Sequence, residues 1–332
     1  MDKIFLCILL GFVFSLLLSP LVIRLIKKLK AKQNIYEYVD MHQKKQGTPT
    51  MGGIIFVLGS VLAFLCVGEK YSHLATVSLI CFASFGVIGF LDDFLKIHLK
   101  RNLGLKPYQK IVGQVAISVI ISVFAYKNIN VGSEIYLPFL SKSIDLGYAY
   151  IPFCIFVFLA LSNGVNLTDG LDGLAGGVTC AYLVGFLGVS YIVLQKTGSF
   201  DAVFLSESTN LLIATGGVFG AVLAYLLANS HPANIFMGDT GSLALGGFLA
   251  SVAIFSKQVL LIPILGLAFV WSCLSVIIQV LHYKRTKKRV FLMAPFHHHL
   301  EKKGMYETKI VSIYIIVTLI ISIFSIFVSL IC

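Results

Sequence analysis

The chain has 332 residues, of which 58% are hydrophobic and only 12% are charged, and its mean hydropathy is +0.92. A soluble domain of this length needs far more polar side chains to cover its surface, so the composition excludes a soluble globular protein. The net charge of +11 would fit a nucleic-acid-binding protein. However, the basic residues flank apolar segments and no recognition motif accompanies them, so we expect no nucleic-acid partner.

Ten segments are apolar enough to be predicted as transmembrane helices, which need about 20 mostly apolar residues each. They cover residues 4–26, 52–68, 74–91, 111–127, 150–165, 173–194, 210–228, 241–256, 258–281 and 310–331. The second and fourth are short, and the boundary near Lys257 is the least sharp. We therefore expect an all-α polytopic membrane protein that forms a single domain over residues 1–332.

The first segment is too long for a signal-peptide core and lacks a small-residue cleavage pattern, so we interpret it as a retained span. The seven cysteines are scattered without paired spacing. They are typical of small apolar residues inside spans rather than of a disulfide framework or a metal site.

Lysine and arginine predict the orientation. Most of the 26 basic residues lie in three alternate loops, 27–51, 92–110 and 283–309. Positively charged loops stay in the cytoplasm, so both termini are expected outside, in agreement with an even number of spans. On the outer side, residues 128–148 alternate apolar and polar positions, which predicts a short hairpin.

Five aspartates lie where predicted spans reach the cytoplasmic side: Asp92, Asp93, Asp169, Asp172 and Asp239. A carboxylate at a membrane boundary is costly, and one alone could simply mark a helix end. Five of them on one side indicate a functional site. We therefore expect an active cleft at the cytoplasmic face.

The first pair is adjacent. On a helix, Asp92 and Asp93 diverge by about 100°, and Lys96 shares the face of Asp92. One acid could hold a metal or lie beside a phosphate while the other transfers a proton. An exposed ion pair at a helix end is the structural alternative.

The next motif repeats a polar residue every three positions at Asn163, Asn166, Asp169 and Asp172. If this stretch is helical, the four side chains form one stripe. The spacing loosely resembles a calcium loop, but the alternating ligands and the closing glutamate of such a loop are missing.

Residues 229–242 combine small and polar positions with an aromatic ring. Phe236 could stack on a base, Asn229 could meet a base edge and Asp239 could bind a cation, which together suit a nucleotide pocket; a plain turn is the alternative. Residues 44–53 add Lys45 and several glycines, which suit a phosphate, although the order is not that of a Walker A loop.

Three consecutive histidines, His297, His298 and His299, precede Glu301. Zinc is one interpretation, but adjacent residues rarely direct three imidazoles at one ion. We favour a role with phosphate or protons. Anchoring to lipid headgroups is the structural alternative.

Together these motifs predict phosphoryl-type transfer between a soluble diphosphate donor and a lipid acceptor. Carboxylates suit a hard cation, whereas lysines and histidines suit phosphates. In such a reaction the protein mainly positions the partners and neutralises charge.

Five motifs in this order resemble the phospho-N-acetylmuramoyl-pentapeptide-transferase family, over essentially the whole chain. They are Gly-Thr-Pro-Thr-Met-Gly-Gly at 47–53, Asp-Asp-Phe-Leu-Lys at 92–96, Asn-Leu-Thr-Asp-Gly-Leu-Asp-Gly at 166–173, Asn-Ile-Phe-Met-Gly-Asp-Thr-Gly-Ser at 234–242 and Pro-Phe-His-His-His-Leu-Glu at 295–301. The resemblance implies a ten-helix, dimeric enzyme of the bacterial cytoplasmic (inner) membrane that requires Mg²⁺. It would transfer phospho-MurNAc-pentapeptide from UDP-MurNAc-pentapeptide to undecaprenyl phosphate, giving lipid I and UMP in peptidoglycan biosynthesis.

The resemblance also implies residue roles. Asp239 matches the magnesium ligand, Asp92 and Asp93 match the catalytic pair, His297 matches the functional first histidine, and Phe236 matches the ring that stacks on uracil. One acid of the pair would deprotonate the lipid phosphate for direct attack; a covalent intermediate is the other route. The substrate-binding residues that it implies are Lys45, Thr50, Lys96, Asn166, Asp169, Asp172, Asn229, His298 and His299.

Two alternatives remain open at this point. A related transferase would use UDP-GlcNAc, and the histidine run with Glu301 favours the muramoyl-pentapeptide donor instead. A cation-coupled transporter would place its acids near the middle of the bilayer, whereas these acids lie at one edge.

Overall fold

The computed structural model describes residues 1–28, 47–69, 72–99, 104–140, 142–196 and 201–332. Within these ranges nine helices are long and apolar enough to cross a membrane, and α2 is a shorter apolar helix. The predicted all-α polytopic membrane protein is therefore confirmed. The nine long helices and the shorter α2 are, in chain order, α1 (Asp2–Lys28), α2 (Gly53–Val67), α3 (His73–His98), α4 (Pro107–Lys127), α5 (Tyr150–Thr168), α6 (Leu174–Lys196), α7 (Ala202–Asn229), α8 (Gly238–Phe255), α10 (Leu267–Thr286) and α12 (Glu307–Ile331).

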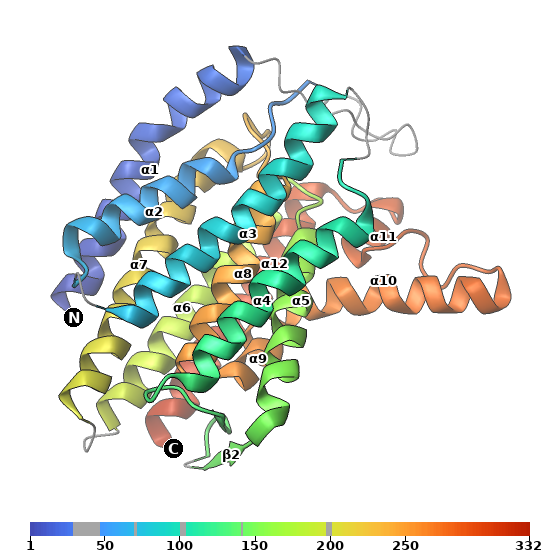
Figure 1. Cartoon of the computed structure of the whole chain (residues 1–332). Coiled ribbons are helices and arrows are strands. Elements are labelled where there is room, and N and C mark those ends of the chain that lie inside the picture. The colour runs from blue at the N-terminus through green and yellow to red at the C-terminus, as the bar shows by residue number, and fades with distance from the viewer. Residues whose placement is uncertain (29–46, 70–71, 100–103, 141, 197–200) are drawn as a thin grey trace.

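Both termini lie at the same end of the bundle (Figure 1), as an even number of spans requires. The predicted hairpin is also at this end. Strand β1 (Glu134–Tyr136) pairs antiparallel with β2 (Ser143–Asp145), and a 3₁₀ turn, η2 (Gly147–Ala149), leads into α5. The opposite end of the bundle is therefore left for the loops that carry the aspartate motifs.

The centre of the bundle is α8, which packs against α2, α3 and α5. Every residue of α8 from Thr240 to Phe255 is buried. A helix that is apolar on all sides is stable only inside a core. Small residues allow the close packing: a Cβ at Gly89 of α3 would overlap the backbone carbonyl of Asp239, so α3 and α8 meet backbone to backbone at the level of the acids.

Three predicted helix boundaries were clearly wrong. The seventh segment begins at Ala202 rather than at residue 210. The third segment does not end at residue 91 but continues to His98, because Asp92 and Asp93 find partners and need not leave the helix. The fourth begins at Pro107 rather than 111 and is not short. Proline is suited to the first turn of a helix, where its missing N–H costs no hydrogen bond.

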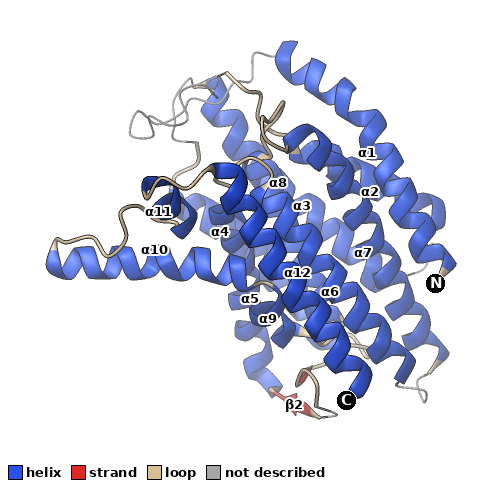
Figure 2. Cartoon of the chain, turned by 180° about the vertical axis from the view of Figure 1, so that it is seen from behind, coloured by secondary structure: helices blue, strands red, loops and turns tan. Residues whose placement is uncertain are grey.

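The ninth predicted segment, 258–281, is not one helix. It is divided into η3 (Val259–Leu261), α9 (Ile262–Leu265) and α10, with Pro263 inside α9 and Gly266 between α9 and α10. Proline and glycine are the residues that interrupt helices most strongly. Beyond the break, α10 projects away from the bundle (Figures 1 and 2). The predicted loop 283–309 contains a further short helix, α11 (Phe296–Lys302).

Candidate active site

Three carboxylates and two lysines converge where α3, α4 and α8 meet. Lys96 Nζ lies 2.5 Å from Asp92 Oδ2, 3.7 Å from Asp93 Oδ1 and 2.9 Å from Asp239 Oδ2. Lys110 Nζ, from α4, lies 2.6 Å from the same Asp239 oxygen. Asp92 and Asp93 are each only 3% exposed. Buried charges of this kind are stable only when paired, and here the two signs nearly balance.

Each carboxylate is held by a further donor. Asp93 Oδ2 accepts from both the backbone N–H (2.9 Å) and the hydroxyl (2.7 Å) of Thr240, at the start of α8. Asp92 Oδ1 accepts from the backbone N–H of Leu105 at 2.8 Å. Asn166 donates to Asp239 Oδ1 at 2.6 Å. The positions of the three acids are therefore set by the helix ends themselves, before any ligand binds.

This donor set fits a hard divalent cation. One oxygen from each of Asp92, Asp93 and Asp239 lies within 4.8 Å of the others. Carboxylate oxygens are the ligands that Mg²⁺ accepts, and Mg²⁺ usually completes its shell with water and substrate phosphate. The three acids could thus hold one ion, while Lys96 and Lys110 would become available to phosphate oxygens.

The predicted polar stripe is only partly helical. Helix α5 ends at Thr168, so Asn163 and Asn166 lie on it, whereas Asp169 and Asp172 lie in the turn that follows. Asp169 is partly buried on the same side as the acid cluster. Burial, followed by the negative charges of Asp239, Asp93 and Asp172, raises the pKa of Asp169 to about 8.

The first and fourth motifs pair with each other. Gly52 N–H donates to the Phe236 carbonyl and Phe236 N–H donates to the Pro49 carbonyl, both at 2.8 Å. The buried Thr50 lies beside Gly238, where a Cβ would be 2.7 Å from Thr50 Oγ1. Phe236 stays partly exposed and lies three positions before Asp239 in the sequence. Lys45, predicted to bind substrate here, lies outside the described residues.

The side chain of Asn229 is not positioned to contact the edge of a base. It is buried, its Oδ1 accepts from Gly173 N–H at 3.1 Å, and its Nδ2 donates to the Ile235 carbonyl at 2.9 Å. Both ends of the amide are thus used to join the turn after α5 to the segment before α8.

Asp172 is part of a second cluster that sequence reasoning missed. Its Oδ2 lies 3.2 Å from His231 Nδ1 and accepts from Ala233 N–H at 3.1 Å. Glu307, the first residue of α12, accepts from the Asp172 backbone N–H at 2.7 Å and lies 3.4 Å from the same His231 nitrogen. The available signal for Glu307 was an acid just before the predicted span 310–331. The five aspartates therefore do not form one cluster.

Lys110 was also missed as a site residue, because a lysine in a basic loop is ordinarily a topology signal. Its position within the first turns of α4 places it opposite Asp239. Only the packing of α4 beside α3 and α5 makes this contact.

The three histidines of α11 diverge. His297 is fully buried and a Cβ at Gly170 would overlap its ring, so His297 borders the turn after α5. His298 Nδ1 lies 2.6 Å from Glu301 Oε2, and His299 Nδ1 accepts from the Leu292 N–H at 3.1 Å. Burial and Lys303 lower the pKa of His299, which favours this accepting, neutral form.

Within the described ranges, these imidazoles form no zinc site. Among the described residues, two groups of His, Cys, Asp or Glu converge closely enough for an ion, and neither contains His297, His298 or His299.

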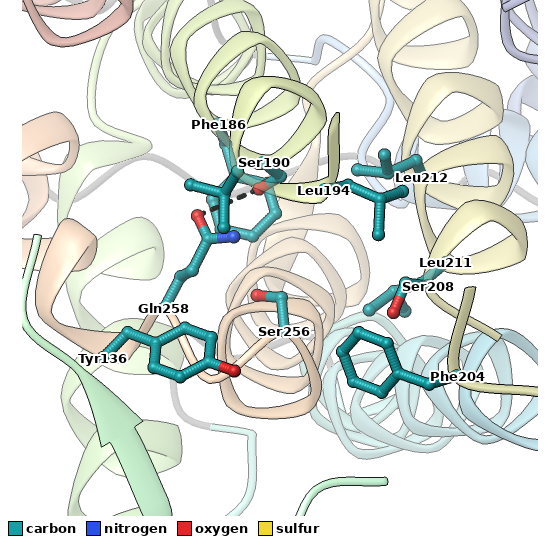
Figure 3. Close-up of a pocket in the computed structure, with 11 residues that line it drawn as sticks. Tyr136, Phe186, Ser190, Leu194, Phe204, Ser208, Leu211, Leu212, Ser256 and Gln258 are labelled. Atoms are coloured by element: carbon teal, nitrogen blue, oxygen red, sulfur yellow. Dashed lines mark hydrogen bonds between the residues drawn. The ribbon is translucent and has the colours of Figure 1, made fainter. Parts of the chain in front are cut away.

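A separate hollow lies near the hairpin and is lined mainly by apolar side chains from α6 and α7 (Figure 3). Its polar contact is a hydrogen bond from Ser190 Oγ to Gln258 Oε1 at 3.1 Å. None of the described residues that line it is a carboxylate, lysine or histidine, so these residues lack the groups needed for acid–base or phosphate chemistry.

Comparisons with known proteins identify the family of the chain. Residues 75–257 match the model of glycosyl transferase family 4, and residues 45–57 match a phospho-N-acetylmuramoyl-pentapeptide-transferase signature. The chain is 46% identical to the phospho-N-acetylmuramoyl-pentapeptide-transferase of Clostridium novyi, over 95% of this chain and 93% of that protein. It is 45% identical to the enzyme of that name from Thermoanaerobacter sp., over 96% of each chain, and 42% identical to that of Clostridioides difficile, over 95% and 94%. The chain therefore belongs to the phospho-N-acetylmuramoyl-pentapeptide-transferase family.

Proposed function

We propose that this protein transfers phospho-MurNAc-pentapeptide from UDP-MurNAc-pentapeptide to undecaprenyl phosphate, forming lipid I and UMP for peptidoglycan synthesis. The observation that carries the proposal is the convergence of Asp92, Asp93 and Asp239 with Lys96 and Lys110. The proposal is supported by the sequence identity to transferases of that name, which extends over nearly the full length of the chain. Both substrates are anionic, so the site must offset negative charge while it brings two phosphates together.

Mg²⁺ is the proposed cofactor, with Asp239 as its principal ligand and Asp92 and Asp93 as neighbours. When bound, the ion would neutralise the pyrophosphate of the donor and polarise the phosphorus that is attacked. Lys96 and Lys110, which contact Asp239 here, would then bind the oxygens of the donor phosphates.

Asp93 is the proposed base. Thr240 holds its Oδ2, so Oδ1, which faces Lys96 at 3.7 Å, is the oxygen available to accept the proton of the lipid phosphate. In Asp92, by contrast, Leu105 and Lys96 contact one oxygen each. The deprotonated lipid phosphate then attacks the donor β-phosphorus and UMP leaves.

The nucleoside is proposed to bind along the paired loops. The ring of Phe236 would stack on uracil, and Thr50, Asn166, Asp169, Asp172 and Asn229 would surround the uridine. Lys45, which lies outside the described residues, is a further proposed substrate-binding residue. Because Asn229 is used to join two loops, its part is to shape the pocket rather than to read the base. His297 and His298 border the turn after α5 and would meet the sugar phosphate.

The experiment is UMP release by the purified protein with undecaprenyl phosphate, measured with each of two donors, UDP-MurNAc-pentapeptide and UDP-GlcNAc, with and without Mg²⁺. Lipid product from the first donor alone, and only with Mg²⁺, is the expected result. Product from UDP-GlcNAc alone would assign the protein to a related hexosamine-phosphate transferase. Cation flux in liposomes without UMP release would instead favour a transporter.

The same proposal places the chain in the membrane of a bacterium as one domain of 332 residues. We propose that both termini are outside, that the acid cluster faces the cytoplasm, and that two copies form a dimer. The basic loops on the side of the cluster support this orientation. Protease protection of tags placed at each terminus in inside-out vesicles tests it.

A further inference from the structure

We infer that the basic turn at the tip of α10 binds anionic phospholipid headgroups and thereby holds α11 at the active site. The turn consists of Lys284, Arg285, Lys287 and Lys288, and all four side chains are exposed. The part of this inference that concerns activity rests on the proposed function. The part that concerns lipid binding does not.

Among the described residues, no carboxylate compensates the charge of the turn. No aspartate or glutamate occurs between Asp239 and Glu301 in the sequence. In the described part of the chain, none of the four cationic groups lies within ion-pair distance of a carboxylate; Lys287 lies over the Tyr283 ring at 5.9 Å. Four clustered cations beside a transmembrane helix attract the anionic phosphates of a bilayer surface.

The position of α10 adds a second observation. This helix projects from the bundle (Figures 1 and 2), and Leu274, Ile277, Val280 and Leu281 on it are exposed apolar side chains. A helix with an apolar body and a cationic end is suited to lie in lipid with its end at the headgroups. Lipid is therefore the partner of both parts of the helix, rather than a soluble anion or a protein.

A continuous set of contacts joins the turn to the histidines. Gln279 of α10 holds the returning chain: its Oε1 accepts from the N–H groups of Val290 (3.1 Å) and Phe291 (2.9 Å), and its Nε2 donates to the Phe291 carbonyl (3.1 Å). The next residue, Leu292, donates its N–H to His299 Nδ1 at 3.1 Å. A displacement of the tip is therefore transmitted to α11 through Gln279, Phe291 and Leu292.

Aromatic contacts add a second link between α10 and α11. Trp271 of α10 lies edge-on to Phe296 with ring centroids 5.5 Å apart, and Phe296 N–H donates to Ser275 Oγ at 3.1 Å. Phe296 directly precedes His297. Since Trp271 is the only tryptophan in the chain, its fluorescence reports on this junction alone.

The experiment compares the wild type with the variant K284Q/R285Q/K287Q/K288Q in nanodiscs of phosphatidylcholine with rising phosphatidylglycerol, from none to about 40%. We expect UMP release by the wild type to rise several-fold, with a shift in Trp271 emission, and both responses to be lost in the variant. The double variant K287Q/K288Q should lose part of the response. Its matched control, K27Q/K28Q, removes two exposed lysines at the end of α1 and should respond as the wild type does.

A second measurement does not depend on activity. Native mass spectrometry should show fewer phosphatidylglycerol molecules retained by the fourfold variant than by the wild type or by K27Q/K28Q. Equal retention, or an unchanged lipid response of the variant, would overturn the inference. So would a loss of response in the control, which would assign the effect to surface charge in general. If only the KM for undecaprenyl phosphate rises, the turn binds the acceptor instead. If no protein releases UMP in any lipid, the proposed function fails, while lipid retention still decides the role of the turn.

Discussion

Replacement of Asp239 by alanine tests the centre of the proposed site. Asp239 receives three contacts, from Lys96 at 2.9 Å, Lys110 at 2.6 Å and Asn166 at 2.6 Å. The change removes all three and leaves Asp92 and Asp93 as the carboxylates of the cluster. Lys96 keeps Asp92 as a partner, whereas Lys110 loses the carboxylate that it contacts.

Asp239→Ala is expected to lower activity more strongly than stability. Loss of hydrogen bonds to charged groups, with Lys110 only 17% exposed, is expected to cost about 1–3 kcal/mol of unfolding free energy. The core around α8 is untouched, so the variant should fold. Loss of one ligand to a hard cation is expected to remove about 4 kcal/mol of transition-state stabilisation. Since about 1.36 kcal/mol corresponds to a tenfold change in rate, turnover should fall by about 10³-fold or more.

The assay is UMP release as a function of Mg²⁺ concentration, with a thermal melt of the same sample. Asp145→Ala is the control, because Asp145 is also hydrogen-bonded but lies in the hairpin at the other end of the molecule. It should retain normal turnover. Near-normal UMP release from folded Asp239→Ala, with its Mg²⁺ dependence intact, would refute the assignment of this residue as the metal ligand.

Four further outcomes are expected. Asp93→Asn should lower turnover by about 10³-fold with nearly unchanged UMP binding, because it removes a base and not a nucleotide contact; lost binding, measured by calorimetry, would contradict this. Glu307→Ala should raise KM for the UDP donor about tenfold with little change in kcat, because Asp172 loses its support. Glu307→Gln keeps a side-chain oxygen that can accept the hydrogen bond from Asp172 N–H, so it should recover most of the affinity for the UDP donor. If kcat of Glu307→Ala falls as much as its KM rises, Glu307 has another role. The pKa of Asp169 is raised to about 8, so this carboxyl is neutral below that pH and negative above it. UMP affinity, measured in the presence of a metal chelator, should therefore decline above about pH 8. Asp169→Asn should abolish this decline; if the variant keeps the pH profile of the wild type, Asp169 is not its cause. Gly89→Ala should destabilise the protein by about 1–3 kcal/mol in a thermal melt, because its Cβ would overlap the α8 backbone; a normal melting temperature would show that the helices can separate freely.

Hydropathy predicted the spans well because burial in lipid depends on composition over about 20 residues, which is a local property. It failed where polar residues continue a helix, as at Asp92 and Asp93, since their partners come from α8 and the segment before α4. It also failed at residues 258–281, where Pro263 and Gly266 interrupt an apolar run that has no polar break.

The sequence by itself was enough to predict which kinds of side chain gather at the site. The five aspartates, the histidine run and the basic loops are local motifs, and the alternation of spans assigns all of them to one side of the membrane. This was enough to predict carboxylates and lysines handling phosphate at a membrane edge, and the resemblance supplied the family that the comparisons then confirmed.

Only the tertiary structure decided which of these groups meet. Asp239 joins Asp92, Asp93 and Lys110 from segments up to 147 positions apart in sequence, whereas Asp172 turns away to His231 and Glu307. Such pairings depend on the rotation and crossing of helices, which are set by backbone contacts between small residues in the core. Local patterns carry no information about those contacts, so sequence reasoning predicted the chemistry of the site and the fold determined its partners.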